Sequence, residues 1–362
     1  MEDHRRPVRR LMGAAAGAER GVRVLVAPDS FKGTHGADVV AASVAAGLRS
    51  AGVEPVSMPL ADGGEGTLDV LRGAYGGTVH DVQVTGPLGA PVTGRFLVSA
   101  DGRTAVVETA SASGITLVEP HPLGAWNAST RGTGELVVAA VAGGVERILL
   151  GVGGSATTDG GAGAVASILE HGGLRGRRLE VLCDVTSPFE RAAAVYSPQK
   201  GADAATVARL EERLEALARR LPRDPRGVPR TGCAGGLSGG LWAALGAELR
   251  PGIEVVLDAL GFAEAAGGCV AVVTGEGRLD DQTREGKVVA GVVEACGRSG
   301  GDLPVHAVVG QTRLSDTGSR ALGLSSVTVA STTDELVAAG RRLGRRILDE
   351  HRAAVPGAGR HG

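Results

Sequence analysis

Residues 147–163 constrain the fold more than any other stretch, because an apolar run passes abruptly into a glycine-rich loop. Residues 148–152 predict a buried strand, and the small residues from Gly163 onward predict a helix. Gly153 and Gly154 let the loop backbone approach another group closely, since they carry no Cβ atom. The unit is typical of an α/β fold. Its loop is equally consistent with an anion cradle and with a tight turn that only permits helix–strand packing.

Three other apolar strands also end in polar, glycine-containing loops. Their candidate side chains are Asp29, Ser30 and Lys32 after residues 21–27, Asp62 and Glu65 after residues 53–60, and Glu276, Asp280 and Lys287 after residues 269–273. Ligands of open α/β sheets bind beyond the carboxyl ends of strands, so these side chains are candidates for one site. Helix capping, helix-dipole complementation and solvated ion pairs remain the alternatives.

A second architectural unit is indicated by residues 78–98, which alternate apolar and polar residues about a turn and predict an antiparallel hairpin. Arg131 opens a predicted helix and is either a fork for a carboxylate or a surface arginine. Residues 221–232 are rich in Pro, Arg and Gly and predict a mobile linker. Residues 1–20 predict a disordered tail, because the short apolar part and early acids do not fit a signal peptide.

The bulk composition excludes several classes of protein. The chain has 362 residues and a formal net charge of −2, which argues against broad nucleic-acid or membrane-surface binding. No apolar run is long enough to span a bilayer. Four cysteines without C-x-x-C spacing argue against a zinc site or disulfide framework and favour a reducing cytoplasm. The sequence indicates no oligomeric state.

Common nucleotide motifs do not identify the reaction. The G-x-x-x-x-G-K-[ST] pattern is absent, because Val288 follows Lys287 and Asp281 stands where the first glycine is required. Residues 151–156 fit a loose dinucleotide fingerprint, but not in the first strand–helix unit, so a dinucleotide-binding dehydrogenase remains a weaker alternative. The residues alone support an α/β enzyme with an acidic, glycine-lined cleft for a small anionic or polyol ligand.

Five motifs in order resemble the bacterial glycerate kinase family across about residues 22–310. They are PDSFKG at 28–33, LADGGEGT at 60–67, GGSATTDGGAG at 153–163, PQKGA at 198–202 and TGEGRLD at 274–280. The resemblance implies a two-domain α/β fold. A discontinuous, flavodoxin-like parallel-sheet domain would comprise residues 21–80 and 258–362, and an inserted mixed α/β domain residues 81–257.

The resemblance also implies ATP-dependent phosphorylation of D-glycerate with Mg²⁺, with 2-phosphoglycerate as the favoured product. The chain departs from the family pattern in two places. Ser187-Pro188-Phe189 stands where the family usually has Asn-Pro-Leu, and Cys233 where alanine or glycine is common. A kinase for another small hydroxy acid therefore remains an alternative.

Under this resemblance the candidate residues divide into three roles. Asp280, Lys32, Lys287 and Lys200 are the expected catalytic residues, and Asp184, Glu276 and Asp280 the expected metal ligands. Substrate or phosphate binding is expected of Asp29, Ser30, Asp62, Glu65, Gly153, Gly154, Ser155, Thr157, Asp159 and Arg131. Phosphoryl transfer needs positioning and charge neutralisation, which acids, lysines and loop N–H groups supply.

Overall fold

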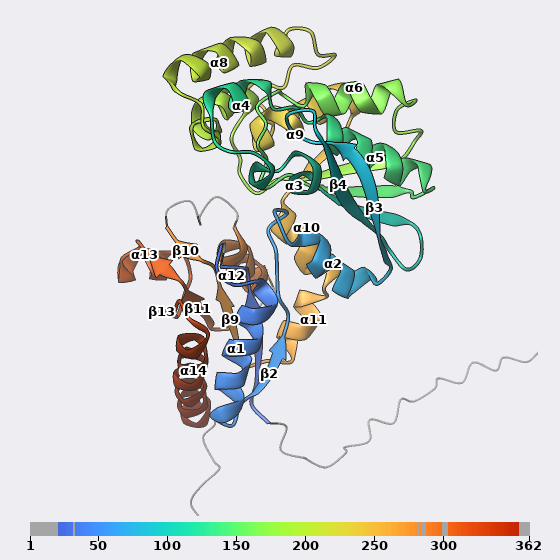
Figure 1. The fold of residues 1–362 in the computed structure, drawn as a ribbon. Helices are drawn as coiled ribbons and strands as arrows, with labels where there is room; N and C mark the ends of the chain where they lie inside the picture. The colour runs from blue at the N-terminus through green and yellow to red at the C-terminus, as the bar shows by residue number, and fades with distance from the viewer. Residues whose placement is uncertain (1–20, 32, 281–282, 284–286, 299–302, 355–362) are drawn as a thin grey trace, which may run out of the picture.

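A computed structural model describes residues 21–31, 33–280, 283, 287–298 and 303–354. These residues form an α/β protein with two large sheets (Figure 1). The first sheet is parallel with the strand order β13-β11-β9-β1-β2. Its strands are β1 (Arg23–Pro28), β2 (Glu54–Ser57), β9 (Ala271–Gly275), β11 (Val305–Val309) and β13 (Ser326–Val329). Both ends of the chain thus build one sheet with the flavodoxin-like order 2-1-3-4-5, as predicted.

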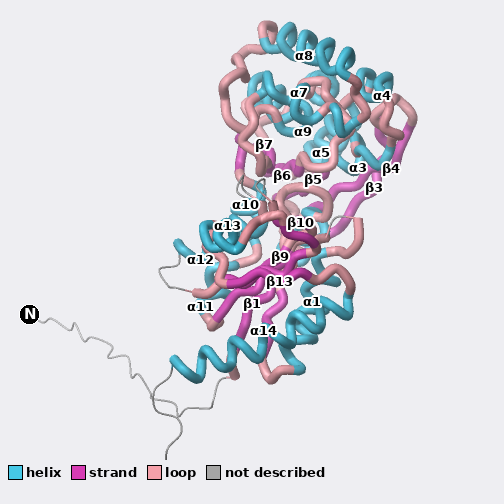
Figure 2. The backbone as a smooth tube through the Cα atoms, turned by 90° about the vertical axis from the view of Figure 1, so that its left-hand side faces the viewer, coloured by secondary structure: helices cyan, strands magenta, loops and turns pink. Residues whose placement is uncertain are grey.

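Helices cover both faces of the first sheet because its strands are apolar on both sides. Val24 and Val26 of β1 pack against α1 and α14, whereas Leu25 and Ala27 point to the opposite face. Figure 2 shows α1 and α14 on one side of the strands and α11 and α12 on the other. The helices around this sheet are α1 (Ala37–Ser50), α10 (Gly252–Ala259), α11 (Phe262–Gly267), α12 (Val288–Arg298), α13 (Asp316–Ala321) and α14 (Thr333–Ala354).

The second sheet is mixed, with the order β3-β4-β5-β6-β7-β8. The first three strands are antiparallel, which confirms the predicted hairpin, and β5 to β8 are parallel. The strands are β3 (Thr78–Thr85), β4 (Pro91–Val98), β5 (Thr104–Glu108), β6 (Arg147–Gly151), β7 (Arg178–Leu182) and β8 (Glu248–Arg250). This sheet is the inserted mixed unit.

Most of the remaining helices lie on the outer face of the second sheet (Figure 1). Ile148 and Leu150 of β6 face them, and Leu149 faces the opposite side. The helices of this unit are α3 (Thr109–Ser113), α4 (Pro122–Asn127), α5 (Arg131–Ala142), α6 (Ala162–Glu170), α7 (Ala192–Tyr196), α8 (Ala204–Ala218) and α9 (Cys233–Leu245), with short 3₁₀ turns at Ile115–Leu117, Phe189–Arg191 and Pro198–Lys200.

One apolar core joins the two sheets. Leu25 of β1 and Leu149 of β6 belong to the same buried cluster. Leu68 and Leu71 of α2 (Thr67–Tyr75) and Ile253 of α10 contribute to it as well, from between the sheets. The two units therefore share apolar packing at their junction, where the site lies.

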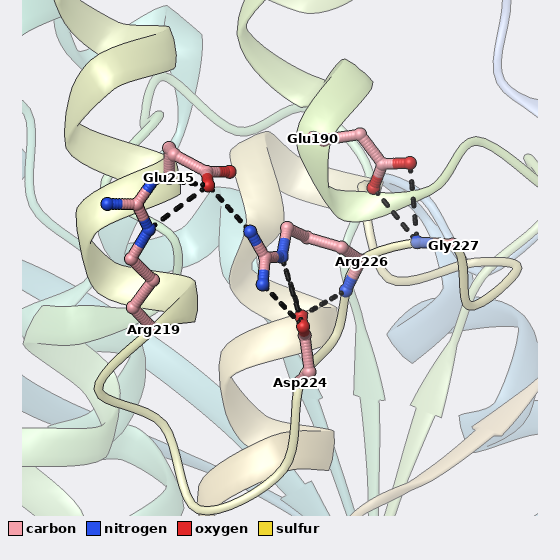
Figure 3. A network of polar contacts seen from close by, with 6 residues as sticks. All are labelled: Glu190, Glu215, Arg219, Asp224, Arg226 and Gly227. Carbon is pink, nitrogen blue, oxygen red and sulfur yellow. Dashed lines mark hydrogen bonds and ion pairs between the residues drawn. The ribbon is translucent and has the colours of Figure 1, made fainter.

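The segment 221–232 is anchored, so the prediction of a mobile linker there is wrong. Arg226 forms ion pairs with Asp224 (2.6 Å) and with Glu215 of α8 (2.6 Å), and Glu190 accepts the N–H of Gly227 (Figure 3). The Arg223 guanidinium stacks on the Trp242 ring, with its central carbon 4.2 Å from the ring centroid. The arginines that suggested a solvated linker instead fasten it to neighbouring elements.

Some element bounds also differ from those predicted. The second strand, β2, is four residues long instead of spanning residues 53–60. The expected domain boundaries at 80/81 and 257/258 fall inside β3 and α10. The expected disordered tail, residues 1–20, lies outside the described residues.

Candidate active site

The carboxyl ends of the first sheet open into an outer cleft of about 420 Å³. It is lined by Asp29, Ser30, Asp62, Glu276, Asp280 and Lys287, among others. Asp29 follows β1 and Glu276 follows β9, and the two loops are fastened where the Asp29 N–H donates to the Gly275 carbonyl (2.8 Å). Three of the predicted strand-end loops thus contribute to one cleft, because they meet at the same edge of the sheet.

The loop after β9 is fixed in place by a small two-stranded sheet, separate from the two large ones. In it, β10 (Arg278–Leu279) pairs in parallel with β12 (Gln311–Thr312). The N–H of Gln311 donates to the Gly277 carbonyl (3.0 Å), and that of Arg313 to the Leu279 carbonyl (2.9 Å). This pairing fixes the backbone on either side of Arg278 and directly before Asp280.

Glu276 lies in an environment that disfavours its charge. Only 4% of the residue is exposed, and burial raises the pKa of its carboxyl to about 7, with Asp280 and Asp62 adding negative charge. The Thr283 hydroxyl donates to Glu276 Oε1 (2.5 Å) and Lys287 lies near enough to oppose the rise. This cluster of acids would be stabilised by a cation.

Asp280 forms an ion pair with Lys287, seven residues further along the chain. Its Oδ1 lies 4.0 Å from Lys287 Nζ, and both side chains are about a quarter exposed. Lys287 immediately precedes α12 and lines the outer cleft together with Asp280. The pair therefore presents one carboxylate and one ammonium to the same space.

An inner cavity of about 490 Å³ adjoins the outer cleft on the side of the second sheet. Gly153, Gly154 and Ser155 line it together with Asp184 and Lys200. Asp62 and Lys287 line both the inner cavity and the outer cleft, so the two spaces meet at these side chains.

Glycines explain how the two loops approach at this junction. A Cβ on Gly153 would collide with Gly64 Cα, and a Cβ on Gly151 would lie 2.7 Å from the Gly63 carbonyl oxygen. Gly63 also has a φ of +91°, which side-chain-bearing residues rarely adopt. The glycine-rich loops of the two motifs are therefore in backbone contact with each other. Part of their glycine content serves this packing.

Asp184 follows the end of β7 by two residues and lines the inner cavity, where it is partly buried. Burial raises its pKa well above the usual range, and the charge of Asp62 adds to the effect. The N–H groups of Gly252 (3.1 Å) and Ile253 (3.4 Å), at the start of α10, donate to Asp184 Oδ1. Asp184 thus stands apart from Glu276 and Asp280, with Asp62 between the two sets.

Lys200 projects into the inner cavity with only 5% of the residue exposed. Its ammonium donates to Ser155 Oγ (3.1 Å) and to the Thr157 carbonyl (2.6 Å). Burial lowers the pKa of Lys200 to about 7, and the charge of Asp159 partly opposes this. Lys200 consequently stabilises the glycine-rich loop through its hydrogen bonds to Ser155 and Thr157.

A third cleft of about 650 Å³ continues from the outer cleft past Asp29 and Ser30. Glu65 lines this part together with Arg95, and the start of α1 forms its floor. Glu65 is exposed, so it faces this cleft from the surface. Ser30 thus lines both the outer and the third cleft, whereas Glu65 lines only the third.

Arg131 does not belong to the site. Its guanidinium lies 2.8 Å from Glu170 Oε2 and 3.2 Å from Glu135 Oε1, on the outer face of α5. None of the three clefts above is lined by it. Glu135 and Glu170 offset the charge of Arg131 at this position, so its binding of substrate stays a prediction that the clefts do not support.

Asp159 has hydrogen-bond partners within the protein, whereas the Thr157 hydroxyl has none among the described residues. Thr130 donates to Asp159 Oδ2 from its N–H (2.9 Å) and its hydroxyl (2.8 Å), and the Gly161 N–H donates to Oδ1 (3.0 Å). Thr157 Oγ1 is buried and has no hydrogen-bond partner among the described residues. The Asp159 side chain therefore stabilises the loop before α6, and Thr157 contributes its carbonyl, which accepts from Lys200.

Two further observations bear on the expected residues. Lys32 lies outside the described residues. Gln311 lines the outer cleft without having been singled out, although its position directly beyond β11 follows the strand-end rule. Lysine is also scarce, with three among 38 basic residues: Lys32 and Lys200 lie in the motifs, and Lys287 follows the last motif by seven residues. This scarcity is a sequence signal for the site that motif reading missed.

The described residues include no preassembled group of three or more His, Cys, Asp or Glu side chains around a metal position. Mg²⁺ in phosphoryl-transfer sites typically takes one or two carboxylates and completes its shell with phosphate oxygens and water. Glu276 and Asp280 fit that requirement; burial is the main cause of the raised pKa of Glu276, and the charge of Asp280 adds to it. Asp184 does not lie with them.

Several known proteins that resemble this chain belong to one family. The profile of the Glycerate kinase family matches residues 24–171 and 169–355. Glycerate 2-kinase of Escherichia coli is 38% identical over 308 residues, covering 75% of this chain and 81% of the relative. Glycerate kinase of Bacillus subtilis is 38% identical over 326 residues, covering 80% and 85%.

A solved structure supports the assignment independently. The crystal structure of a protein from Salmonella typhimurium LT2, provisionally named glycerate kinase 2, superposes with a TM-score of 0.75. It is 34% identical and covers 92% of this chain and 100% of its own. No helix in the described ranges combines the length and apolar character needed to cross a membrane. The chain belongs to the glycerate kinase family.

Proposed function

We propose that this chain transfers the γ-phosphoryl group of ATP to D-glycerate and that 2-phosphoglycerate is the product. The observation that carries the proposal is the junction of two cavities at Asp62 and Lys287. A phosphoryl donor and its acceptor must lie in line and in contact, which two adjoining cavities permit. Membership of the family and the name of the Escherichia coli relative, glycerate 2-kinase, support the acceptor and the product.

The acids and lysines at this junction supply the required chemistry. The glycerate hydroxyl oxygen would attack the γ-phosphorus, the bond to the bridging oxygen of ADP would break, and the hydroxyl proton would pass to Asp280. Lys287, and Lys32 from outside the described residues, would offset the negative charge of the transferred group. Mg²⁺ neutralises phosphate charge when bound, and Glu276 and Asp280 are the residues that would hold it.

The remaining cleft residues would orient the two substrates. Asp29 and Ser30 lie where the outer cleft passes into the third, which gives room for the nucleotide. Asp62 would accept a hydrogen bond from a glycerate hydroxyl at the boundary of the cavities. The four cysteines are free thiols, which supports the expected cytoplasmic location.

The first experiment incubates the purified chain with ATP, Mg²⁺ and D-glycerate and follows ADP release. The product is identified by NMR. We expect ADP release that depends on glycerate, with 2-phosphoglycerate accumulating. Formation of 3-phosphoglycerate would overturn the regiochemistry alone. Glycerate-independent ADP release, or none from a folded chain that binds ATP, would contradict glycerate as the acceptor.

A further inference from the structure

The inner cavity contains a cation that no carboxylate neutralises directly. Lys200 is almost fully buried, and none of the ion pairs formed within the described ranges includes it. Its two hydrogen bonds go to the neutral Ser155 hydroxyl and Thr157 carbonyl. An ammonium carries three donors, so these bonds leave one N–H for a further acceptor.

Such a cation is costly unless an anion accompanies it. Burying a charge in a protein is unfavourable, and the lowered pKa of Lys200 reflects that cost. Chains usually relieve it by pairing the ammonium with a carboxylate. Here the space beside Lys200 is an open cavity bordered by Gly153 and Gly154, where no side chain fills the position.

The charged residues of the two cavities indicate which cavity fits the polyphosphate of ATP and which fits the carboxylate of glycerate. The outer cleft combines Glu276 and Asp280 with Arg278 and Lys287, a set suited to Mg²⁺ and a polyphosphate. The inner cavity offers one buried ammonium near a hydroxyl, and carries Asp184 at its other side. A polyphosphate carries more negative charge than one buried ammonium offsets, whereas a single carboxylate needs only one cation.

We infer that the inner cavity is the glycerate site and that Lys200, with the Ser155 hydroxyl, binds the glycerate carboxylate. This rests on the proposed function and deepens it. The expected catalytic role of Lys200 toward the phosphoryl group is thereby replaced by recognition of the acceptor. The hydroxyls of glycerate then lie toward Asp62 and Lys287, which border the outer cleft.

Binding of the carboxylate should be linked to a proton. In the free chain Lys200 is largely neutral above pH 7, and a carboxylate beside it favours the charged form, so glycerate binding takes up a proton there. The KM for glycerate therefore rises with pH above about 7, by up to about tenfold per unit. The titratable and charged groups that surround Lys200 are Asp62, Asp159, Asp184, Tyr196, Arg213, Cys233 and Lys287.

Steady-state kinetics of Lys200→Met test the assignment with two acceptors, D-glycerate and its methyl ester. Loss of a charge-assisted hydrogen bond should raise the KM for D-glycerate by about 10- to 100-fold. The KM for ATP and the kcat/KM for the uncharged ester should change by less than about threefold. Arg178→Met, which removes an exposed cation of β7, is the matched control.

A larger rise in the KM for ATP than for glycerate, or an equal loss with the ester, would overturn the inference. Calorimetry of the unaltered chain covers the case in which Lys200→Met fails to fold. Glycerate binding at pH 8, measured in two buffers of different ionisation enthalpy, should take up about one proton. Binding without proton uptake would also overturn it. If the unaltered chain neither binds nor phosphorylates glycerate, the proposed function itself fails.

Discussion

At the scale of single residues, burial separates acids that look alike in the sequence. Glu276 is buried with a pKa raised to about 7, whereas Asp280 pairs with Lys287 at the mouth of the cleft. Asp159 is also buried but accepts hydrogen bonds from the backbone around it. Residue type and spacing therefore identify candidate acids. The partners of each acid then indicate whether it acts in catalysis or stabilises the fold.

Asp280→Asn should lower turnover by about 10²-fold or more, because an amide can neither accept the hydroxyl proton nor bind Mg²⁺ as strongly. The measurement is ADP release at saturating ATP and D-glycerate. Asp258→Asn, which changes an exposed acid of α10, serves as the control. A folded Asp280→Asn chain with near-normal turnover would remove Asp280 from the mechanism.

Asp159→Ala should affect stability and leave catalysis largely intact. It leaves the N–H groups of Thr130 and Gly161 without their acceptor, which we expect to lower the free energy of unfolding by about 3 kcal/mol. Urea denaturation measures this change. Arg131→Met, whose guanidinium also lies outside the clefts, should leave kcat/KM for D-glycerate unchanged. A selective rise in the KM of either variant would restore the original substrate-binding expectation.

At the scale of elements, the site depends on contact between two glycine loops from different sheets. The loop before α2 carries Asp62, and the loop after β6 carries Ser155. Gly64 and Gly153 touch through their backbones where the loops cross. This backbone contact holds the two loops together beside the inner cavity, which Gly64 and Gly153 both line.

Gly153→Ala should therefore impair catalysis by pushing these loops apart. Its Cβ would collide with Gly64 Cα, and a displacement near 1 Å between reacting groups can cost about 10²-fold in rate. Steady-state kcat/KM for D-glycerate measures the effect. Gly73→Ala, in α2 with open space at its Cβ, is the matched control and should stay near wild type. Equal activities for the two variants would contradict the proposed role of the contact.

At the scale of the whole molecule, the two sheets share a core. Leu25 of the first sheet and Leu149 of the second lie in one buried cluster that α2 and α10 complete. The first sheet takes β1 and β2 from before the inserted unit and β9, β11 and β13 from after it. Unfolding of either sheet would expose apolar surface of the other.

We expect one cooperative thermal transition for both sheets, measured by differential scanning calorimetry. Leu149→Ala, in the shared core, and Leu150→Ala, in the inserted unit's own core, should each destabilise by about 2 to 5 kcal/mol. Both should lower the temperature of that single transition. Two transitions, of which each variant moves only one, would mean that the units unfold independently.

The sequence by itself determined the strands, the strand-end loops and the family. Apolar runs such as residues 148–152 are long enough to define buried strands, and five motifs in order identify the family. The placement of Asp29 and Glu276 at one edge also followed, because parallel strands present their carboxyl ends together. These are local properties, fixed by neighbours along the chain.

Only the tertiary structure decided which distant residues meet. It paired Arg131 with Glu170, anchored residues 221–232 to α8, and set Gly64 against Gly153 across some ninety residues of chain. It also buried Lys200 beneath the glycine loop, where the surroundings, and not the sequence motif, set its pKa. Charge states and cavities depend on partners brought together by packing, and no local pattern encodes those partners.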